Sequence, residues 1–333
     1  MPDELSPTHV PAGTWRAGKD ELQSALAHCV RAPLDELGVI VASGADAATF
    51  LHTQLTNDIE NLPHDHVIGA GYCTAKGRLL ATLSVWRDRD NVFLQLPLEL
   101  APGVQKRLSM FVLRAKAGLA DDSAAWSTWA VLGPGSADQI RAMCGVAPAV
   151  DSTVAIDGAL ITRLRPSPRV QERFVVRARN DAWRARLSSA RVVSSGVFWW
   201  SQIDAGLPDV FAVTQDRLVP QMINLDVLGA VNFKKGCYPG QEIVARSQYI
   251  GKLRRRMSIA HANGPAGAGI DVYAAGMEQP VGAVVMAAAA PEGGMDLLFE
   301  CPSSRLSGEL RVADNDDPLC LRPLPYELID PTV

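Results

Sequence analysis

A tight turn followed by a helix is encoded in residues 233–246, and this stretch constrains the fold more than any other part of the chain. Residues 238–241 read Tyr-Pro-Gly-Gln. In such a turn proline fixes φ at the second position, and glycine supplies the positive φ of the third. Glu242 and Arg246 then stand four residues apart, the spacing of an ion pair on one helix face. A helix is therefore predicted to begin directly after the turn.

Cys237 precedes this turn, with Lys234 and Lys235 just upstream. Positive charge and the dipole of the following helix both favour the thiolate form of a cysteine. The alternative is a buried, inert cysteine in a tight turn. The two lysines together with the Pro-Gly turn favour a reactive cysteine.

Bulk composition is that of an ordinary globular protein. The 333 residues are enough for two or three domains, and 47% of them are hydrophobic and 20% charged. A net charge of −4 gives no overall attraction to nucleic acid or to an anionic membrane. RNA binding would therefore need a local basic patch.

The six cysteines are scattered and include no Cys-x-x-Cys pair. This spacing argues against a structural zinc site and a disulfide framework. The chain begins without a basic, apolar signal segment, and its longest apolar run, residues 281–290, is too short to span a bilayer. The sequence therefore predicts a cytoplasmic protein with no metal site and no membrane contact.

Apolar periodicity and breaker residues predict further elements along the chain. Strands are expected at 38–42, 111–116 and 126–132, a hairpin turns near Lys76 and Gly77, and helices are expected at 43–58, 98–110, 135–144, 181–189 and 195–208. Nine arginines fall between residues 163 and 191. They are interpreted as a solvated surface, with a phosphate-binding face as the alternative. A basic cluster at residues 252–256 is likewise interpreted as a surface feature, and the alternatives are that it binds the acidic tail of a ligand or an RNA phosphate.

Residues 235–242, Lys-Gly-Cys-Tyr-Pro-Gly-Gln-Glu, resemble the K-G-C-[FY]-x-G-Q-E signature of the YgfZ family of folate-binding proteins. These proteins are relatives of the glycine-cleavage T-protein, an aminomethyltransferase, and include iron–sulfur assembly factors. Residues 44–58 resemble the opening motif of the family, and the turn at 75–78, Ala-Lys-Gly-Arg, resembles one that faces the folate cavity. The resemblance covers roughly residues 35–256 and the tail at 324–327.

This resemblance implies an α+β, aminomethyltransferase-like fold. Two interwoven ferredoxin-like lobes and a small C-terminal β-barrel would surround a cavity for tetrahydrofolate or a folate derivative. The expected domains are a flexible leader at 1–30, the two-lobed folate-binding region at 31–256 and the barrel at 257–333.

The site residues follow from the same resemblance. In the relatives the segment equivalent to 195–208 lines the pterin pocket, so Phe198 or Trp199 would stack on the pterin and Asp204 would bind its 2-amino group. The family more usually carries Glu at that position, and a plain aromatic core helix is the alternative. Cys237 is the expected catalytic thiol. The remaining expected cofactor-binding residues are Lys76, Lys235, Tyr238, Gln241 and Arg246.

One departure separates the chain from the transferase. The T-protein carries a pair of Asp residues where this chain has Ala81 and Thr82, so acid–base chemistry there loses its carboxylate. The resemblance therefore implies a tetrahydrofolate-binding factor that supports assembly or repair of iron–sulfur enzymes, including tRNA-thiolating ones. The alternatives are a folate-dependent aminomethyltransferase or other one-carbon transferase, and a folate-responsive tRNA-binding regulator. The expected partners are iron–sulfur client or assembly proteins and, transiently, tRNA, with the protein a monomer or weak dimer.

Overall fold

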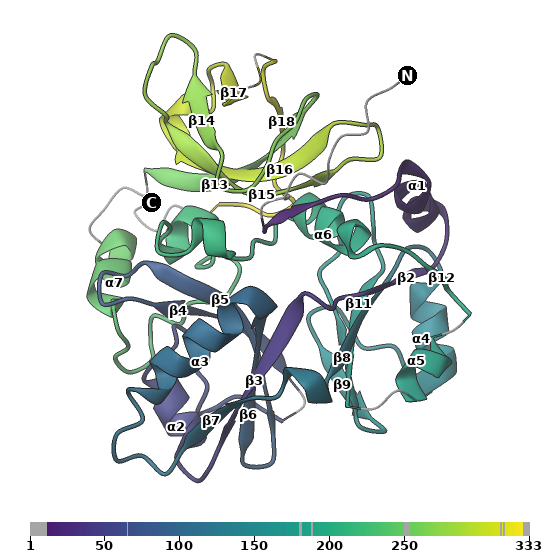
Figure 1. Cartoon of the computed structure of the whole chain (residues 1–333), viewed down its shortest axis with the longest axis vertical. Coiled ribbons are helices and arrows are strands. Elements are labelled where there is room, and N and C mark those ends of the chain that lie inside the picture. The colour runs from purple at the N-terminus through teal and green to yellow at the C-terminus, as the bar shows by residue number, and fades with distance from the viewer. Residues whose placement is uncertain are drawn as a thin grey trace.

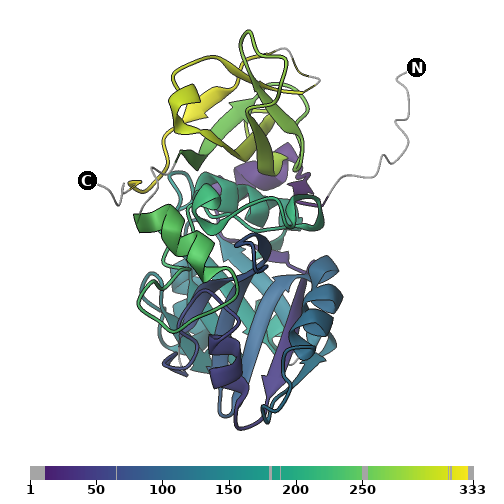
Figure 2. The same ribbon diagram turned by 90° about the vertical axis from the view of Figure 1, so that its left-hand side faces the viewer.

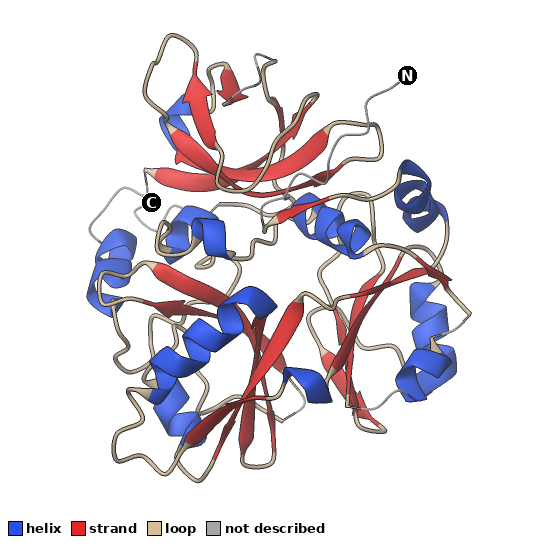
Figure 3. Cartoon of the chain, in the orientation of Figure 1, coloured by secondary structure: helices blue, strands red, loops and turns tan. Residues whose placement is uncertain are grey.

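Three β-sheets, a central helix and several peripheral helices form the molecule. The computed structural model describes residues 12–64, 66–179, 182–187, 189–249, 254–313, 315 and 317–328. One sheet lies above the other two, which stand side by side below it (Figure 1). Figure 2 shows the same stacking from the side. Helices and strands both contribute to the lower layers, whereas the upper sheet is almost entirely β (Figure 3). The predicted α+β fold class is confirmed.

The first lower sheet has five strands, all antiparallel to their neighbours, in the order β4-β5-β6-β3-β7. Its strands are β3 (Leu37–Ser43), β4 (Val67–Cys73), β5 (Leu79–Asp88), β6 (Asn91–Pro97) and β7 (Gly118–Asp121). Helices α2 (Ala47–His52) and α3 (Ala101–Ser109), with the 3-10 turns η1 (Leu98–Leu100) and η2 (Ser123–Ala125), belong to this lobe. The hairpin β4–β5 turns at residues 74–78, as the sequence predicts.

The second lower sheet has six strands in the order β12-β2-β8-β11-β10-β9. Its strands are β2 (Val30–Pro33), β8 (Ser127–Leu132), β9 (Thr153–Ile156), β10 (Ala159–Arg163), β11 (Arg173–Ala178) and β12 (Arg191–Val192). Helices α4 (Ser136–Cys144) and α5 (Ala182–Arg186) accompany it. Because β2 precedes the first sheet in the chain and the other strands follow it, the two lobes are interwoven.

The upper sheet follows the order β17-β14-β15-β16-β13-β18, with β1 added along β15. Its strands are β1 (Thr14–Trp15), β13 (Arg255–Ala262), β14 (Asp271–Ala274), β15 (Gly282–Ala289), β16 (Met295–Pro302), β17 (Leu310–Val312) and β18 (Cys320–Arg322). The short 3-10 turn η5 spans Ser303–Arg305. The sheet is strongly curved, so its inner face holds a separate apolar core that includes Phe299 and Val312.

Helix α6 (Ser195–Asp204) lies at the centre of the molecule, between the upper sheet and the lower layers (Figure 1). It contacts β15 and β16 above and β2 and β8 below. Eight of its ten residues are buried, because a helix enclosed on all sides needs no polar face. The 3-10 turns η3 (Ala212–Thr214) and η4 (Pro220–Ile223) and helix α7 (Gln241–Tyr249) follow.

The N-terminal segment and residues 111–116 both differ from the sequence predictions. Residues 12–30 are not a loose leader: β1 pairs with β15, and α1 (Lys19–Ala27) buries Leu22 completely. The Glu21 carboxylate also binds the backbone nitrogen of Ser194 at the start of α6, at 2.8 Å. Residues 1–11 lie outside the described part of the chain. Residues 111–116 form no strand; Leu113 has a positive φ and is 86% exposed, so its run of apolar residues is a surface turn.

The arginine-rich stretch is solvated only in part: Arg179, Arg186 and Arg191 are exposed, as interpreted from the sequence, whereas other arginines lie inside the molecule. Arg173 and Arg177 of β11 are buried, and Arg169 is held by Asp204, Glu292 and Asp296. Spacing alone cannot distinguish a charged surface from buried arginines that have hydrogen-bond partners. None of the described helices is both long and apolar enough to cross a membrane.

Candidate functional site

Two turns from distant parts of the chain pack against each other beside Cys237. Gly240 has a φ of 82°, and Gly77 of the β4–β5 turn has a φ of 71°. A Cβ on Gly240 would lie 2.4 Å from the Thr74 carbonyl oxygen and 2.6 Å from the Gly77 backbone. Only glycine permits both the left-handed backbone and this close approach. The predicted turn and the helix that begins at Gln241 are therefore present, and the β4–β5 hairpin holds them.

Cys237 is exposed on this loop, so its thiol is accessible to a partner molecule. Lys235 does not point freely into solvent: its ammonium donates to the carbonyl oxygens of His52 and Leu55, the latter at 2.8 Å. Burial lowers the pKa of Lys235 to about 8, although electrostatic attraction to Asp58 and Cys237 acts in the opposite direction and raises it. Lys235 therefore ties the loop to the end of α2 as well as placing positive charge near Cys237.

Tyr238 is buried beneath the same loop, and the Lys235 ammonium lies 5.0 Å from the centre of its ring. Burial raises the pKa of Tyr238 far above its ordinary value, and no described group hydrogen-bonds its hydroxyl. The Gln241 backbone nitrogen donates to the Tyr238 carbonyl at 3.1 Å. Lys76 and Arg246 are exposed. Tyr238 and Gln241 thus shape the turn, and contact of Lys76, Tyr238, Gln241 and Arg246 with a cofactor stays a prediction.

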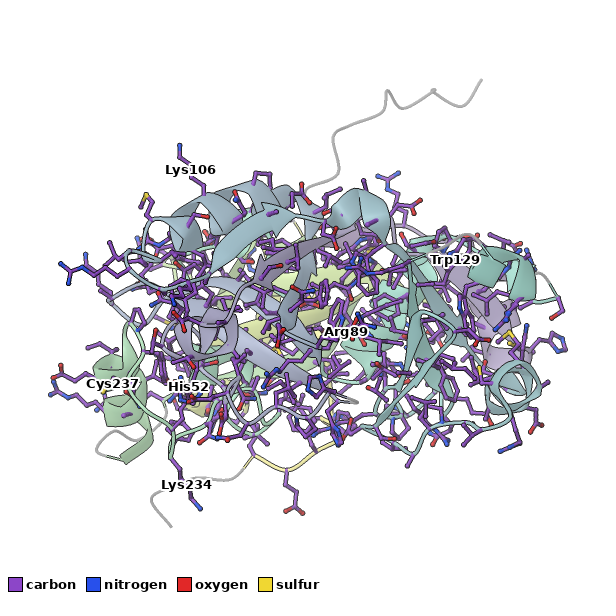
Figure 4. The ribbon with its side chains drawn as sticks, turned by 90° about the horizontal axis from the view of Figure 1, so that it is seen from below. His52, Arg89, Lys106, Trp129, Lys234 and Cys237 are labelled. Atoms are coloured by element: carbon purple, nitrogen blue, oxygen red, sulfur yellow. The ribbon has the colours of Figure 1, made fainter. Side chains whose placement is uncertain are left out.

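An Asp–His pair beside this loop was not among the residues predicted from the sequence. The Asp58 carboxylate lies 3.1 Å from Nδ1 of His52 and also accepts from the Asn61 side chain at 2.9 Å. The other ring nitrogen, Nε2, would lie 3.8 Å from a Cβ on Gly236. Figure 4 shows His52, Lys234 and Cys237 at the same end of the molecule. The sequence feature that could have indicated this pair is the motif at residues 44–58, which contains both His52 and Asp58.

A second group of expected residues lines an internal cavity next to α6. The cavity measures about 60 Å³ and is lined by Leu37, Ser84, Gln95, Leu96, Leu164, Val175, Arg177, Phe198, Trp199, Gln202 and Asp209. An adjoining cleft of about 330 Å³ shares Ser84, Leu164 and Arg177 with it and also holds Arg163 and Arg165. Cleft and cavity together are within the usual size of small-molecule sites, about 300–1,000 Å³.

Phe198 and Trp199 are both in the wall of this cavity, and the stacking of either ring on a pterin stays a prediction. One face of Trp199 is already stacked on Trp15, with ring centroids 4.4 Å apart, and its indole nitrogen donates to Glu36. Phe198 meets Trp199 edge to face at 5.1 Å. The two rings therefore form a fixed apolar wall, and Trp199 has at most one face for a ligand.

Asp204 does not line this cavity and is engaged elsewhere. Its fully buried carboxylate accepts from the Arg169 backbone at 3.0 Å and is paired with the Arg169 and Arg322 guanidinium groups. Burial alone would raise the pKa of Asp204, but hydrogen bonds from Ser167, Arg322 and Arg169 hold it below the ordinary value. Its predicted contact with a pterin is therefore not supported. Asp204 instead joins α6 to the upper sheet.

A carboxylate does stand beside Thr82, although not from the expected segment. The Thr82 hydroxyl donates to Asp209 at 2.6 Å and accepts from the Val210 backbone nitrogen at 3.0 Å. Asp209 therefore brings a carboxylate to the position in β5 where the chain itself carries Thr82. The structure does not bring all expected residues into one cavity: Lys76, Lys235, Cys237, Tyr238, Gln241 and Arg246 are absent from the lining of both the cavity and the cleft.

A comparison with models of protein families finds no match. The chain is similar to two proteins called tRNA-modifying protein YgfZ. The one from Edwardsiella ictaluri (strain 93-146) is 30% identical over 305 residues, covering 88% of this chain and 91% of the relative. The one from Escherichia coli O157:H7 (strain EC4115 / EHEC) is 26% identical over 308 residues, covering 89% and 92%.

Among solved structures, the chain resembles the glycine cleavage system aminomethyltransferase T from Bartonella henselae. The TM-score is 0.72 at 16% identity, with 92% of this chain and 88% of that chain covered. This likeness shows the aminomethyltransferase-like fold, and the similarity to the first two proteins along almost their whole length shows the family. The chain belongs to the YgfZ family of tRNA-modifying proteins.

Proposed function

We propose that this protein is a tetrahydrofolate-binding factor that supports the assembly or repair of iron–sulfur enzymes, including those that thiolate tRNA. The observation that carries the proposal is the exposed thiol of Cys237 on a loop fixed by the Gly77–Gly240 contact and by Lys235. Such a loop presents one accessible cysteine in a defined place. Clusters normally take four protein ligands, so a single thiol acts on a client or assembly protein rather than holding a cluster alone.

The cavity beside α6 fits a folate in the chemistry of its walls. Phe198 and Trp199 offer apolar rings, Asp209 offers a hydrogen-bond acceptor, and Arg177 offers donors. The adjoining cleft adds Arg163 for an anionic tail. When bound, the folate would supply one-carbon chemistry, and the role of these side chains is to hold and orient it.

A gene-deletion experiment in the source cells tests the proposal. Loss of this protein is expected to lower the content of 2-methylthio-modified bases in tRNA several-fold, because iron–sulfur enzymes make that modification, and the wild-type gene is expected to restore it. The modified bases are measured by mass spectrometry of digested tRNA. An unchanged level in the deletion strain would contradict the proposed role.

A one-carbon transferase remains the second candidate, because Asp209 places a carboxylate beside Thr82. A carboxylate in this position can serve as an acid or base, the function that Ala81 and Thr82 cannot provide. This candidate is distinguished by catalytic turnover of an aminomethyl or formaldehyde donor with tetrahydrofolate in the purified protein.

A further inference from the structure

Asp209 is a carboxylate with spare hydrogen-bonding capacity in the wall of the internal cavity. One of its oxygens accepts from Thr82 at 2.6 Å, and its backbone nitrogen contacts the Met286 sulfur at 3.0 Å. No described residue donates to its second carboxylate oxygen. Burial raises the pKa of Asp209 to about 6, against the hydrogen bond from Thr82. Asp209 is only partly buried and lines the cavity, so its second oxygen can accept a hydrogen bond from water or from a ligand that enters there.

Arg177 is a cation in the same wall, and no described carboxylate pairs with it. Its side chain is only 3% exposed, and it donates to Gln95 at 2.7 Å and to the Thr162 hydroxyl at 3.0 Å. Burial lowers the pKa of Arg177 to about 10, which leaves it charged at neutral pH. A buried guanidinium with only neutral partners can still bind an acceptor or an anion. Because it lines both the cavity and the cleft, it is accessible to a ligand that occupies either.

We infer that Asp209, held by Thr82, is the carboxylate that recognises the ligand in this cavity, with Arg177 binding an acceptor or anionic group of the same molecule. The matching chemistry is a flat heterocycle that carries N–H donors and is linked to an acidic portion. The inference rests on the proposed function in taking that ligand to be a reduced folate. Asp209 thus takes the ligand-binding role that was expected for Asp204, whose carboxylate is paired with Arg169 and Arg322.

Recognition through Asp209 makes binding depend on pH. The ionised carboxylate accepts two N–H groups, whereas the protonated acid loses part of that capacity, so affinity falls as pH drops through about 6. Arg177 on β11 lines the cavity with Asp209, and Glu99 of η1 binds the Ala212 backbone nitrogen further along the same loop. Thr82 and Met286 contact Asp209 as neutral groups.

The test is calorimetric titration of the full-length protein with 5-formyltetrahydrofolate between pH 5 and 8. Asp209→Asn is expected to weaken binding about 10- to 100-fold at pH 8 and to remove the dependence on pH, as for loss of a charged hydrogen bond. Thr82→Val removes the hydrogen bond that favours the ionised acid, so its midpoint is expected to move to higher pH. Asp216→Asn, the same change at an exposed site on the same loop, is the matched control and should bind as wild type.

The possible outcomes distinguish the role of Asp209 from the proposed binding of folate. If wild type binds and Asp209→Asn keeps its affinity and its pH profile, the inference is overturned while the proposed function stands. If wild type does not bind at any pH, both the folate proposal and the inference are overturned. Thermal unfolding of each variant shows whether a loss of binding reflects a loss of folded protein. An unchanged midpoint in a folded Thr82→Val variant would also contradict the role of Thr82.

Discussion

Replacing Gly240 by alanine is expected to destabilise the protein by about 3 kcal/mol. The left-handed backbone of Gly240, with φ at 82°, costs a non-glycine residue about 1 kcal/mol. The added Cβ would also lie 2.4 Å from the Thr74 carbonyl oxygen, and such overpacking costs about 1–3 kcal/mol more. Urea unfolding followed by tryptophan fluorescence measures the difference in free energy of unfolding.

Gly145 provides the matched control for this change. It has a φ of 74° at the end of α4, and no atom lies within 4 Å of a Cβ built there. Gly145→Ala should therefore cost only the backbone strain, about 1 kcal/mol. If the two variants lose the same stability, the contact between the turns is not what requires glycine at position 240.

Arg256→Gln is expected to destabilise the protein by about 3–5 kcal/mol, the usual effect of removing one partner of a buried ion pair. The Arg256 guanidinium binds both oxygens of the Asp226 carboxylate, at 2.6 and 2.9 Å, and both side chains are at most 5% exposed. Without Arg256 the buried charge of Asp226 has no guanidinium to neutralise it. The measurement is again the free energy of unfolding in urea.

The neighbouring Arg254 is exposed and serves as the control. Arg254→Gln should change stability by less than about 0.5 kcal/mol, as is usual for a surface substitution. Equal effects of the two changes would contradict the buried ion pair.

The same geometry bears on the RNA-binding alternative. Arg255 is paired with Glu300 through two hydrogen bonds, at 2.7 and 2.8 Å, and Arg256 with Asp226. Two of the three arginines in the cluster that the RNA-binding alternative would use therefore bind carboxylates within the protein, and Lys252 lies outside the described residues. A tRNA-binding regulator would need another basic surface. Its test is tRNA affinity that falls steeply with salt.

Local features were predictable from the sequence because local chemistry determines them. The Pro-Gly turn and helix α7 follow from the preferences of Pro239 and Gly240. Aromatic residues in a short apolar stretch indicated the buried helix α6. That Phe198 and Trp199 line a cavity was implied only by the family resemblance.

Contacts between distant segments were not predictable in the same way. Asp209 and Thr82 form a hydrogen bond although they are 127 positions apart in the chain, and Asp204 and Arg322 do so although they are 118 apart. Which carboxylate faces the cavity depends on these pairings, and no single segment encodes them. The loose-leader prediction failed for the same reason, since Glu21 meets Ser194 across 173 positions.

The most direct test of the central claim compares two cysteine variants in the deletion strain. Cys237→Ser and Cys320→Ser change the same atom at two exposed cysteines, one on the motif loop and one on β18 of the upper sheet. The readout is the level of 2-methylthio-modified tRNA bases, with both variants expressed at wild-type amounts. Cys320→Ser is expected to restore the modification and Cys237→Ser to leave it at the level of the deletion strain. Full restoration by Cys237→Ser would contradict the account.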